Sequence, residues 1–188
     1  MTMRTHVTAV VRACFAALRQ IRRVRRSLSR HALLTLVHAL IVNKVDYCNS
    51  VFIGISGQLQ DRLQSVWNAV ARLVFSARRS ERITPLFREL HWLRVPERIK
   101  FRLCVQAYRC LRGTGPSTLL EAFSGHLTST LDAVCVLLTQ PCWWCRAFPV
   151  ASARAWNSQP SSVRNAPSLT TLRRELKTVL FRSSFDND

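Results

Sequence analysis

Apolar side chains recur at intervals of three and four residues along most of this sequence, the spacing that places them on one face of an α-helix. Near the start of the chain such a stripe consists of Val7, Val11, Cys14, Leu18 and Ile21. The same spacing returns in several later segments and dominates the sequence. It predicts an all-α fold, and the length of 188 residues limits that fold to one domain or two small ones.

Turn and cap residues mark the ends of the predicted helices. The segment 30–45 is apolar on almost every side, which predicts the most buried helix of the fold. Thr84 precedes Pro85 and is the expected N-cap of a short helix, and Ser168 is the expected cap of the last helix. Together these signals predict helices over residues 7–26, 30–45, 58–77, 84–91, 95–112, 117–123 and 169–181.

The character of the sequence changes after about residue 116. We expect residues 1–123 to form a bundle of about five helices and residues 124–145 to form an irregular linker. Residues 146–188 are expected to form a smaller, partly irregular helical module that ends in an amphipathic helix.

The chain is strongly basic, with 28 Lys and Arg residues against 10 Asp and Glu residues and a net charge of +18. Of the 28 cations, 25 are arginines, whose planar guanidinium groups bind phosphate or carboxylate in a bidentate manner. Nearly all of the excess positive charge lies in residues 1–112. The expected partner is the sugar–phosphate backbone of RNA or DNA.

Two groups of arginines are the candidate phosphate contacts. In the first predicted helix Arg19, Arg22, Arg23 and Arg26 share one face, and no acidic residue occurs before Asp46. A solvated basic face is the alternative, but the repulsion among these charges favours an anionic partner. The full predicted set is Arg12, Arg19, Arg22, Arg23, Arg26, Arg72, Arg78, Arg79 and Arg82.

Catalytic and membrane functions find little support in the sequence. A two-metal centre needs converging carboxylates, whereas the acidic residues here are scattered. The close pair Asp186 and Asp188 stands at the end of the sequence. We therefore expect no catalytic residue and no cofactor. The longest apolar stretch, residues 32–42, is far shorter than the roughly 20 residues that span a bilayer.

The cysteines suggest one weak metal site. His126, Cys135, Cys142 and Cys145 could supply four zinc ligands, but they contain a single Cys-x-x-Cys pair, and free buried thiols are the expected alternative. The odd number of cysteines, seven, favours a reducing compartment, the nucleus or cytoplasm. The Arg-rich, acid-free start is also typical of a mitochondrial transit peptide, but the helical pattern continues through it, so we expect it to belong to the fold.

A series of short motifs resembles one known family. In chain order they are Leu36–Leu40 (LVHAL), Val45–Ser50 (VDYCNS), Leu63–Gln64, Asn68–Leu73 (NAVARL), Ile83–Leu86 (ITPL), Leu90–Leu93 (LHWL), Arg146–Phe148 (RAF), Ala155–Ser158 (AWNS) with Pro160, Leu176–Thr178 (LKT) and Leu180–Phe181. They resemble the region downstream of the polymerase core in jockey-like non-LTR retrotransposon (LINE) reverse transcriptases. The resemblance covers about residues 6–123 and 146–185.

The resemblance implies a thumb-like helical domain without catalysis of its own. In the family the catalytic aspartates lie in a palm upstream of this region, and an endonuclease domain lies further upstream, and this sequence matches neither. The thumb grips the template–primer duplex and helps to position target DNA, so the implied partners are RNA, DNA and the missing polymerase core. Residues 125–145 and Trp67 depart from the family pattern.

Three alternatives stay open at this point. The chain could be a small protein that recognises a specific DNA sequence, as a helix-turn-helix does. It could retain the RNA-directed DNA polymerase activity of the parent that it resembles. It could also be a transposon remnant without function.

Overall fold

A computed structural model describes residues 3–48, 55–115 and 143–185 of the chain. Every regular element in these ranges is a helix, which confirms the predicted all-α fold. The chain forms two compact units, one of Met1–Pro96 with Ser184–Asp188 and the other of Glu97–Ser183. Each unit is considered by itself.

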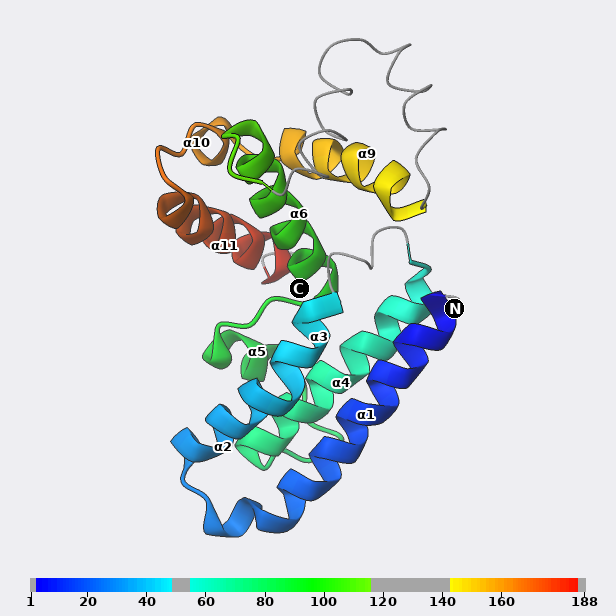
Figure 1. The fold of residues 1–188 in the computed structure, drawn as a ribbon. Coiled ribbons are helices and arrows are strands. Elements are labelled where there is room, and N and C mark those ends of the chain that lie inside the picture. Colours follow the sequence, from blue (N-terminus) through cyan, green and yellow to red (C-terminus); the bar gives the residue numbers. More distant parts are fainter. Residues whose placement is uncertain (1–2, 49–54, 116–142, 186–188) are drawn as a thin grey trace. The chain divides into compact units, whose positions relative to one another are not determined.

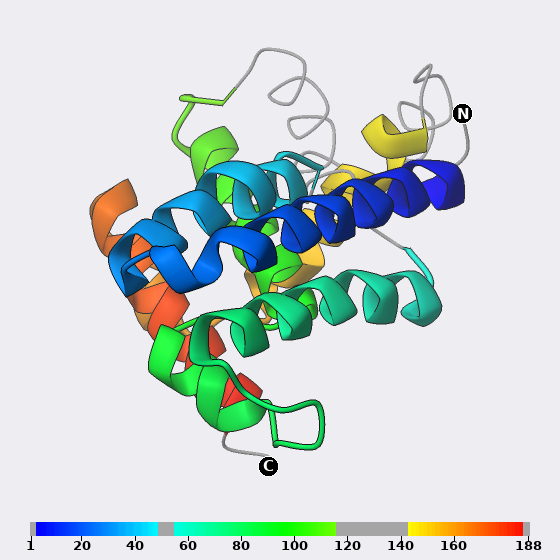
Figure 2. The ribbon, with the colours of Figure 1, turned by 90° about the horizontal axis from the view of Figure 1, so that it is seen from below.

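The first unit is a bundle in which α1 and α4 lie side by side (Figures 1 and 2). A short 3-10 turn, η1, follows α1, and a turn of π-helix, η2, joins α2 to α3 without a break. The elements are α1 (Met3–Val24), η1 (Arg25–Ser27), α2 (Arg30–Val37), η2 (His38–Val42), α3 (Asn43–Cys48), α4 (Gly57–Phe75) and α5 (Thr84–Leu90).

Helices α1 and α4 run in the same direction. The guanidinium of Arg62 near the start of α4 donates to the hydroxyl of Thr8 near the start of α1, at 3.1 Å. Beyond the other ends of the two helices, Arg25 donates to the hydroxyl of Ser76. The continuous helix formed by α2, η2 and α3 makes the return path that this parallel arrangement requires, and it packs on both of them.

The core of the first unit forms on the stripes that the sequence predicts. Val7 and Cys14 of α1 are fully buried, as are Leu63 and Val66 of α4. The largest fully buried side chain is Trp67, whose ring stands edge-on to that of Trp92 at 5.2 Å between centroids. A tryptophan at position 67 therefore serves packing in this fold.

The helix over residues 30–48 corrects one prediction. Its core positions Leu33, Val37 and Ile41 are buried, but His38 is exposed and Leu40 keeps 44% of its surface accessible. The segment is thus amphipathic, and α4 carries more buried side chains than α2 and η2. The helix also continues to Cys48, three residues beyond its predicted end at residue 45.

The predicted caps have different outcomes. The hydroxyl of Ser168 accepts a hydrogen bond from the backbone N–H of Thr171 at 3.1 Å, which confirms it as the cap of the last helix. Thr84 was expected to cap α5, but Ile83 occupies the N-cap position, so Thr84 and Pro85 already belong to the first helical turn. The helix itself begins at residue 84, as predicted, and Pro85 lies in its first turn, where its missing N–H is tolerated.

The second unit contains α6 (Val95–Leu111) from Glu97 onward, α9 (Trp143–Asn157), α10 (Ser161–Arg164) and α11 (Leu169–Phe185) up to Ser183. Its buried side chains include Phe148, Val163, Leu172 and Leu176. The hydroxyl of Tyr108 on α6 donates to the backbone carbonyl of Ala166 at 3.2 Å, which ties α6 to the loop before α11.

The expected domain boundary falls where the structure is not described. The expected boundary at residue 123, the predicted helix 117–123 and most of the linker 124–145 lie outside the described residues. The compact units divide between Pro96 and Glu97, so most of α6 belongs to the same unit as the C-terminal helices. No helix within the described ranges is both long and apolar enough to cross a membrane.

Candidate nucleic-acid interface

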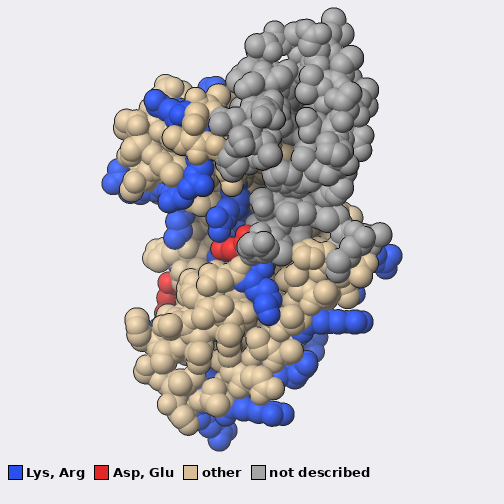
Figure 3. Space-filling model, viewed as in Figure 1, with Lys and Arg blue, Asp and Glu red and all other residues tan. Residues whose placement is uncertain are grey.

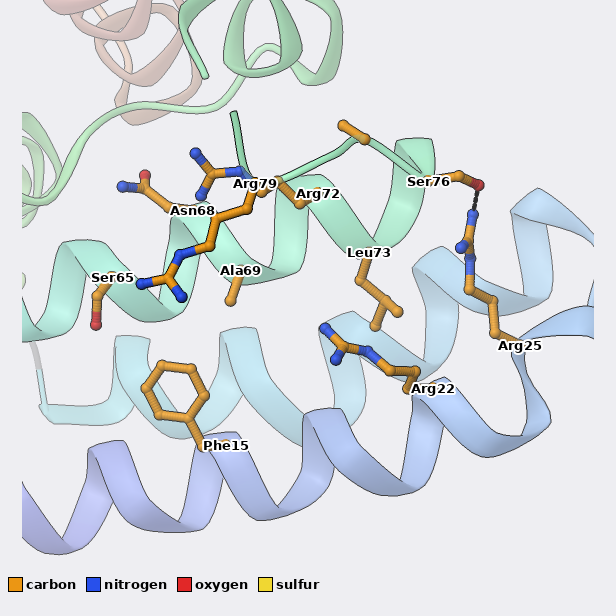
Figure 4. A pocket seen from close by; sticks show the side chains of 11 residues that line it. Phe15, Arg22, Arg25, Ser65, Asn68, Ala69, Arg72, Leu73, Ser76 and Arg79 are labelled. Carbon is orange, nitrogen blue, oxygen red and sulfur yellow. Dashed lines mark hydrogen bonds between the residues drawn. The ribbon is translucent and has the colours of Figure 1, made fainter. Parts of the chain in front are cut away.

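A groove of about 670 Å³ lies along the contact between α1 and α4 in the first unit (Figure 4). Two of its walls are helices that lie about 50 residues apart in the sequence, and the segment after α4 adds Ser76, Ala77 and Arg79. The lining residues are Phe15, Arg22, Arg25, Ser65, Asn68, Ala69, Arg72, Leu73, Ser76, Ala77 and Arg79.

Helical spacing explains why these positions form a groove. On α4, Ser65, Ala69 and Arg72 follow one another at intervals of four and three residues, so they share a face. On α1, Phe15 and Arg22 are seven residues apart and share another. The small side chains of Ser65 and Ala69 leave open the space that larger side chains would fill, and the longer side chains stand around it (Figure 4).

Four arginines converge on this groove, and among the described residues that line it none is acidic. Arg22 and Arg25 come from the end of α1 and from η1, and Arg72 and Arg79 come from α4 and the segment after it. Arg30 forms an ion pair with Glu89 at 2.8 Å, and neither of these residues lines the groove. The groove is therefore a concentrated positive site, suited to bind phosphate.

Arg72 shows that the charge is incompletely matched by the protein itself. Its Nε atom is buried and has no hydrogen-bond partner in the described structure. A buried donor without an acceptor costs free energy, and such cases in folded proteins call for an explanation, which a bound ligand can supply. The folded chain thus holds Arg72 in the groove wall at the expense of stability.

The amide of Asn68 is held in a defined orientation. Gln64 accepts a hydrogen bond from the backbone N–H of Val95 at 2.9 Å through Oε1, and its Nε2 donates to Oδ1 of Asn68 at 3.0 Å. Because the oxygen of Asn68 is engaged by Gln64, the two N–H groups of its amide remain as donors at the groove. This arrangement adds a neutral donor to the cationic ones.

The structure divides the predicted arginines between two surfaces. Arg22, Arg72 and Arg79 meet in the groove. Arg12, Arg19, Arg23 and Arg26 are exposed and do not line it, and Arg26 lies in η1 beyond the end of α1. In Figure 3 blue side chains gather along the edge of the first unit that α1 forms. Accordingly, the single strip that the sequence predicts is split, with Arg22 facing α4 and the others facing outward.

Arg78 and Arg82 lie in the exposed segment after α4 and do not line the groove. An acidic side chain accompanies this segment, because the backbone N–H of Arg78 donates to the carboxylate of Glu81 at 2.7 Å. The surface around Arg78 and Arg82 is therefore less positively charged than the groove.

Arg25 and Arg62 were not among the predicted phosphate contacts. Arg25 lies in η1 and turns toward Ser76, so an uninterrupted helical pattern does not place it in the groove. Arg62, one turn before Ser65 on α4, lies with Arg4 around a second hollow of about 510 Å³ near the helix starts, which also includes Asp61. The signal for Arg62 was available, since positions 62, 65, 69 and 72 share a helical face.

The suggested zinc site cannot be assembled from the described residues. His126, Cys135 and Cys142 lie outside them, and Cys145 lies in α9 at a position whose side chain is not described. Among described side chains no group of three or more ligands could hold a metal ion. Cys14, Cys104 and Cys110 are buried free thiols. Burial raises the pKa of Cys104 from 9.0 to about 12, although nearby Lys100 opposes the rise.

Comparisons with protein-family models, with curated proteins and with solved structures find no match for this chain. The function of the groove is therefore inferred from its own lining residues.

Proposed function

We propose that this protein binds nucleic acid through the sugar–phosphate backbone, using the α1/α4 groove together with the exposed arginines of α1. The observation that carries the proposal is the convergence of Arg22, Arg25, Arg72 and Arg79 in one groove whose described lining contains no acidic residue. Arginine at such a density matches the regular negative charge of a polynucleotide.

The outer arginines of α1 extend the basic surface beyond the groove. Arg12, Arg19 and Arg23 span 11 positions of one helix, or roughly 16 Å at 1.5 Å per residue. A row of this length can accompany several successive phosphates, which binds backbone without reading base sequence.

The resemblance to the thumb region of non-LTR retrotransposon reverse transcriptases agrees with such a role. On this proposal the chain is a non-catalytic, thumb-like part of an RNA-directed DNA polymerase, and a separate polymerase core, which this sequence does not match, would perform the chemistry. Primer extension with added Mg²⁺ is then expected to show no incorporation, and incorporation would contradict this part of the proposal.

The test is a salt titration of binding to labelled duplexes, both DNA and RNA–DNA hybrid, followed by fluorescence anisotropy. Each phosphate contact contributes about 0.9 to the magnitude of the slope of log affinity against log salt for duplex DNA. We expect two triple variants, R12Q/R19Q/R23Q and R22Q/R72Q/R79Q, to reduce both the affinity and the slope.

The matched control is R173Q/R174Q/R182Q, which removes the same charge from exposed positions of α11. We expect it to change affinity less than either test variant. Equal losses in all three variants would show that net charge alone governs binding and would contradict the assigned surface. Absence of duplex binding even at low salt would overturn the proposal.

Competition with unrelated DNA separates backbone binding from sequence recognition. Backbone binding predicts that unrelated duplexes compete equally. A preference of about 10³-fold or more for one sequence would instead identify a sequence-specific DNA-binding protein.

A further inference from the structure

The α1/α4 groove holds an aromatic ring as well as cations. Phe15 projects from α1 toward α4 between the two helices, and the side chain of Arg79 extends back along α4 toward Ser65 above it (Figure 4). The ring is partly exposed, unlike the fully buried Trp67 and Phe148 of the two cores. A partly exposed ring beside guanidinium groups is the combination on which unpaired bases stack in single-strand binding proteins.

The size of the groove suits a small flat group. Its volume of about 670 Å³ falls within the range of roughly 300–1,000 Å³ that is usual for small-ligand clefts. The bases of a duplex are stacked and paired, so a duplex can offer only its backbone to the arginines around the groove. A base that has left its stack can enter between the helices.

The polar groups of the groove fit both parts of a nucleotide. The amide N–H groups of Asn68, oriented by Gln64, can donate to acceptors on the edge of a base. Ser65 donates its hydroxyl proton to the carbonyl of Arg62 at 2.7 Å, so toward the groove its oxygen is an acceptor. Arg22, Arg72 and Arg79 supply the donors for a phosphate, and Arg72 brings a buried Nε that lacks a partner.

We infer that the α1/α4 groove is a binding site for one unpaired nucleotide of single-stranded nucleic acid, with the base against Phe15 and its phosphate among the groove arginines. This inference rests on the proposed backbone binding and adds a preference for strands whose bases are free. The outer arginines of α1 then contact the backbone on either side of the bound nucleotide.

The experiment uses the full chain and a 12-nucleotide single strand, as DNA and as RNA, with one central 2-aminopurine. The fluorescence of 2-aminopurine reports stacking on an aromatic ring, and anisotropy of an end label reports affinity. A paired duplex of the same sequence is measured in parallel. The variants are Phe15→Leu, which removes the ring, and Phe15→Trp, which keeps an aromatic face.

Phe75→Leu is the matched control, because Phe75 is another partly exposed phenylalanine of the same unit and lies outside the groove lining. We expect Phe15→Leu to weaken single-strand binding by about tenfold, the order of one lost base–aromatic stack, and to abolish the 2-aminopurine response. Duplex affinity should change less than twofold, Phe15→Trp should retain the response, and Phe75→Leu should match the wild type. Circular dichroism and thermal unfolding check that each variant is folded.

Two results would overturn the nucleotide site and leave backbone binding intact. In the first, the duplex binds but Phe15→Leu leaves both single-strand affinity and the 2-aminopurine signal unchanged. In the second, inorganic phosphate displaces the single strand equally well from the wild type and from Phe15→Leu, which would show a plain anion site. Failure of wild-type protein to bind either the duplex or the single strand would overturn the proposed function itself.

Discussion

The guanidinium of Arg25 donates a hydrogen bond to the hydroxyl of Ser76, a residue 51 positions further along the chain. Arg25 lies in the turn after α1, and Ser76 ends α4 in the left-handed conformation, with φ 58° and ψ 22°. The contact joins the ends of the two helices that form the basic groove. Arg25 therefore has two roles. It links the ends of the two helices, and it is a candidate phosphate ligand.

The left-handed backbone of Ser76 gives a prediction about stability. The variants Ser76→Ala and Ser76→Gly both lose the hydroxyl, but glycine adopts positive φ without the strain that a Cβ introduces. We expect Ser76→Gly to be more stable than Ser76→Ala by about 1 kcal/mol in urea unfolding. At Ser80, whose φ is not positive, the order should reverse, because glycine there adds freedom to the unfolded chain. If the Gly and Ala variants have the same order of stability at both sites, the left-handed conformation of Ser76 is contradicted.

The hydrogen bonds of Gln64 lead to a second prediction. Gln64→Leu removes the acceptor of the Val95 backbone N–H and the donor to Asn68. We expect a loss of about 1–3 kcal/mol in the free energy of unfolding, the cost of leaving partly buried polar groups without partners. Gln64→Glu keeps an acceptor for Val95 and should lose less. Equal stability of the Leu variant and the wild type in urea unfolding would show that these bonds contribute nothing.

Burial of Leu63 can be tested against exposure of Leu40, since both are leucines in helices of the first unit. Leu63 is fully buried, whereas Leu40 is 44% exposed. Leu63→Ala should lower stability by about 2–5 kcal/mol because it removes core contacts and leaves a cavity. Leu40→Ala should change it by about 0.5 kcal/mol or less. Chemical denaturation measures both, and similar losses would mean that Leu40 is covered in solution.

The raised pKa of Cys104 predicts a loss of stability at high pH. Burial holds the thiol of the folded protein protonated up to about pH 12, whereas the ordinary value is 9.0. Between these values the unfolded chain releases the proton and the folded chain keeps it, so the free energy of unfolding falls as pH rises. In Cys104→Ala this part of the fall should disappear. Unfolding curves of the wild type and of Cys104→Ala at several pH values from 8 to 11 test this prediction. If the free energy of unfolding falls by the same amount in both proteins, the prediction is refuted.

The groove arginines should make stability depend on the anion present. Because phosphate binds the folded groove and finds no such site in the unfolded chain, phosphate should raise Tm more than chloride at equal ionic strength. In R22Q/R72Q/R79Q the difference between the two anions should shrink. If the variant keeps the full phosphate effect, the anion acts elsewhere on the protein.

The spacing of apolar residues predicted the helices that bury one face, because burial of one helical face requires an apolar residue every three or four positions. For α4 and α6 the predicted ranges 58–77 and 95–112 lie within one or two residues of Gly57–Phe75 and Val95–Leu111. The segment 30–48 was less predictable. Its apolar composition does not reveal which side chains lack a neighbour, so the sequence does not distinguish exposed Leu40 from buried Leu33 and Ile41.

The groove was predictable only in part. The sequence identified Arg22, Arg72 and Arg79 as candidates, but nothing in local spacing shows that segments about 50 residues apart come together. Arg25 was missed because the change from α-helix to 3-10 turn alters its direction. The zinc ligands His126, Cys135 and Cys142 lie outside the described residues, so that prediction stays a prediction.

The parallel course of α1 and α4 bears on how a folded chain tolerates four neighbouring cations. Peptide dipoles add along a helix, so its final turn carries a partial negative charge of about half an elementary unit. Two helices pointing the same way bring two such poles to one end of the bundle, where Arg22 and Arg72 occupy the last turns. The backbone itself thus serves as a weak counter-ion for the groove arginines, and a phosphate with its full charge can outcompete it.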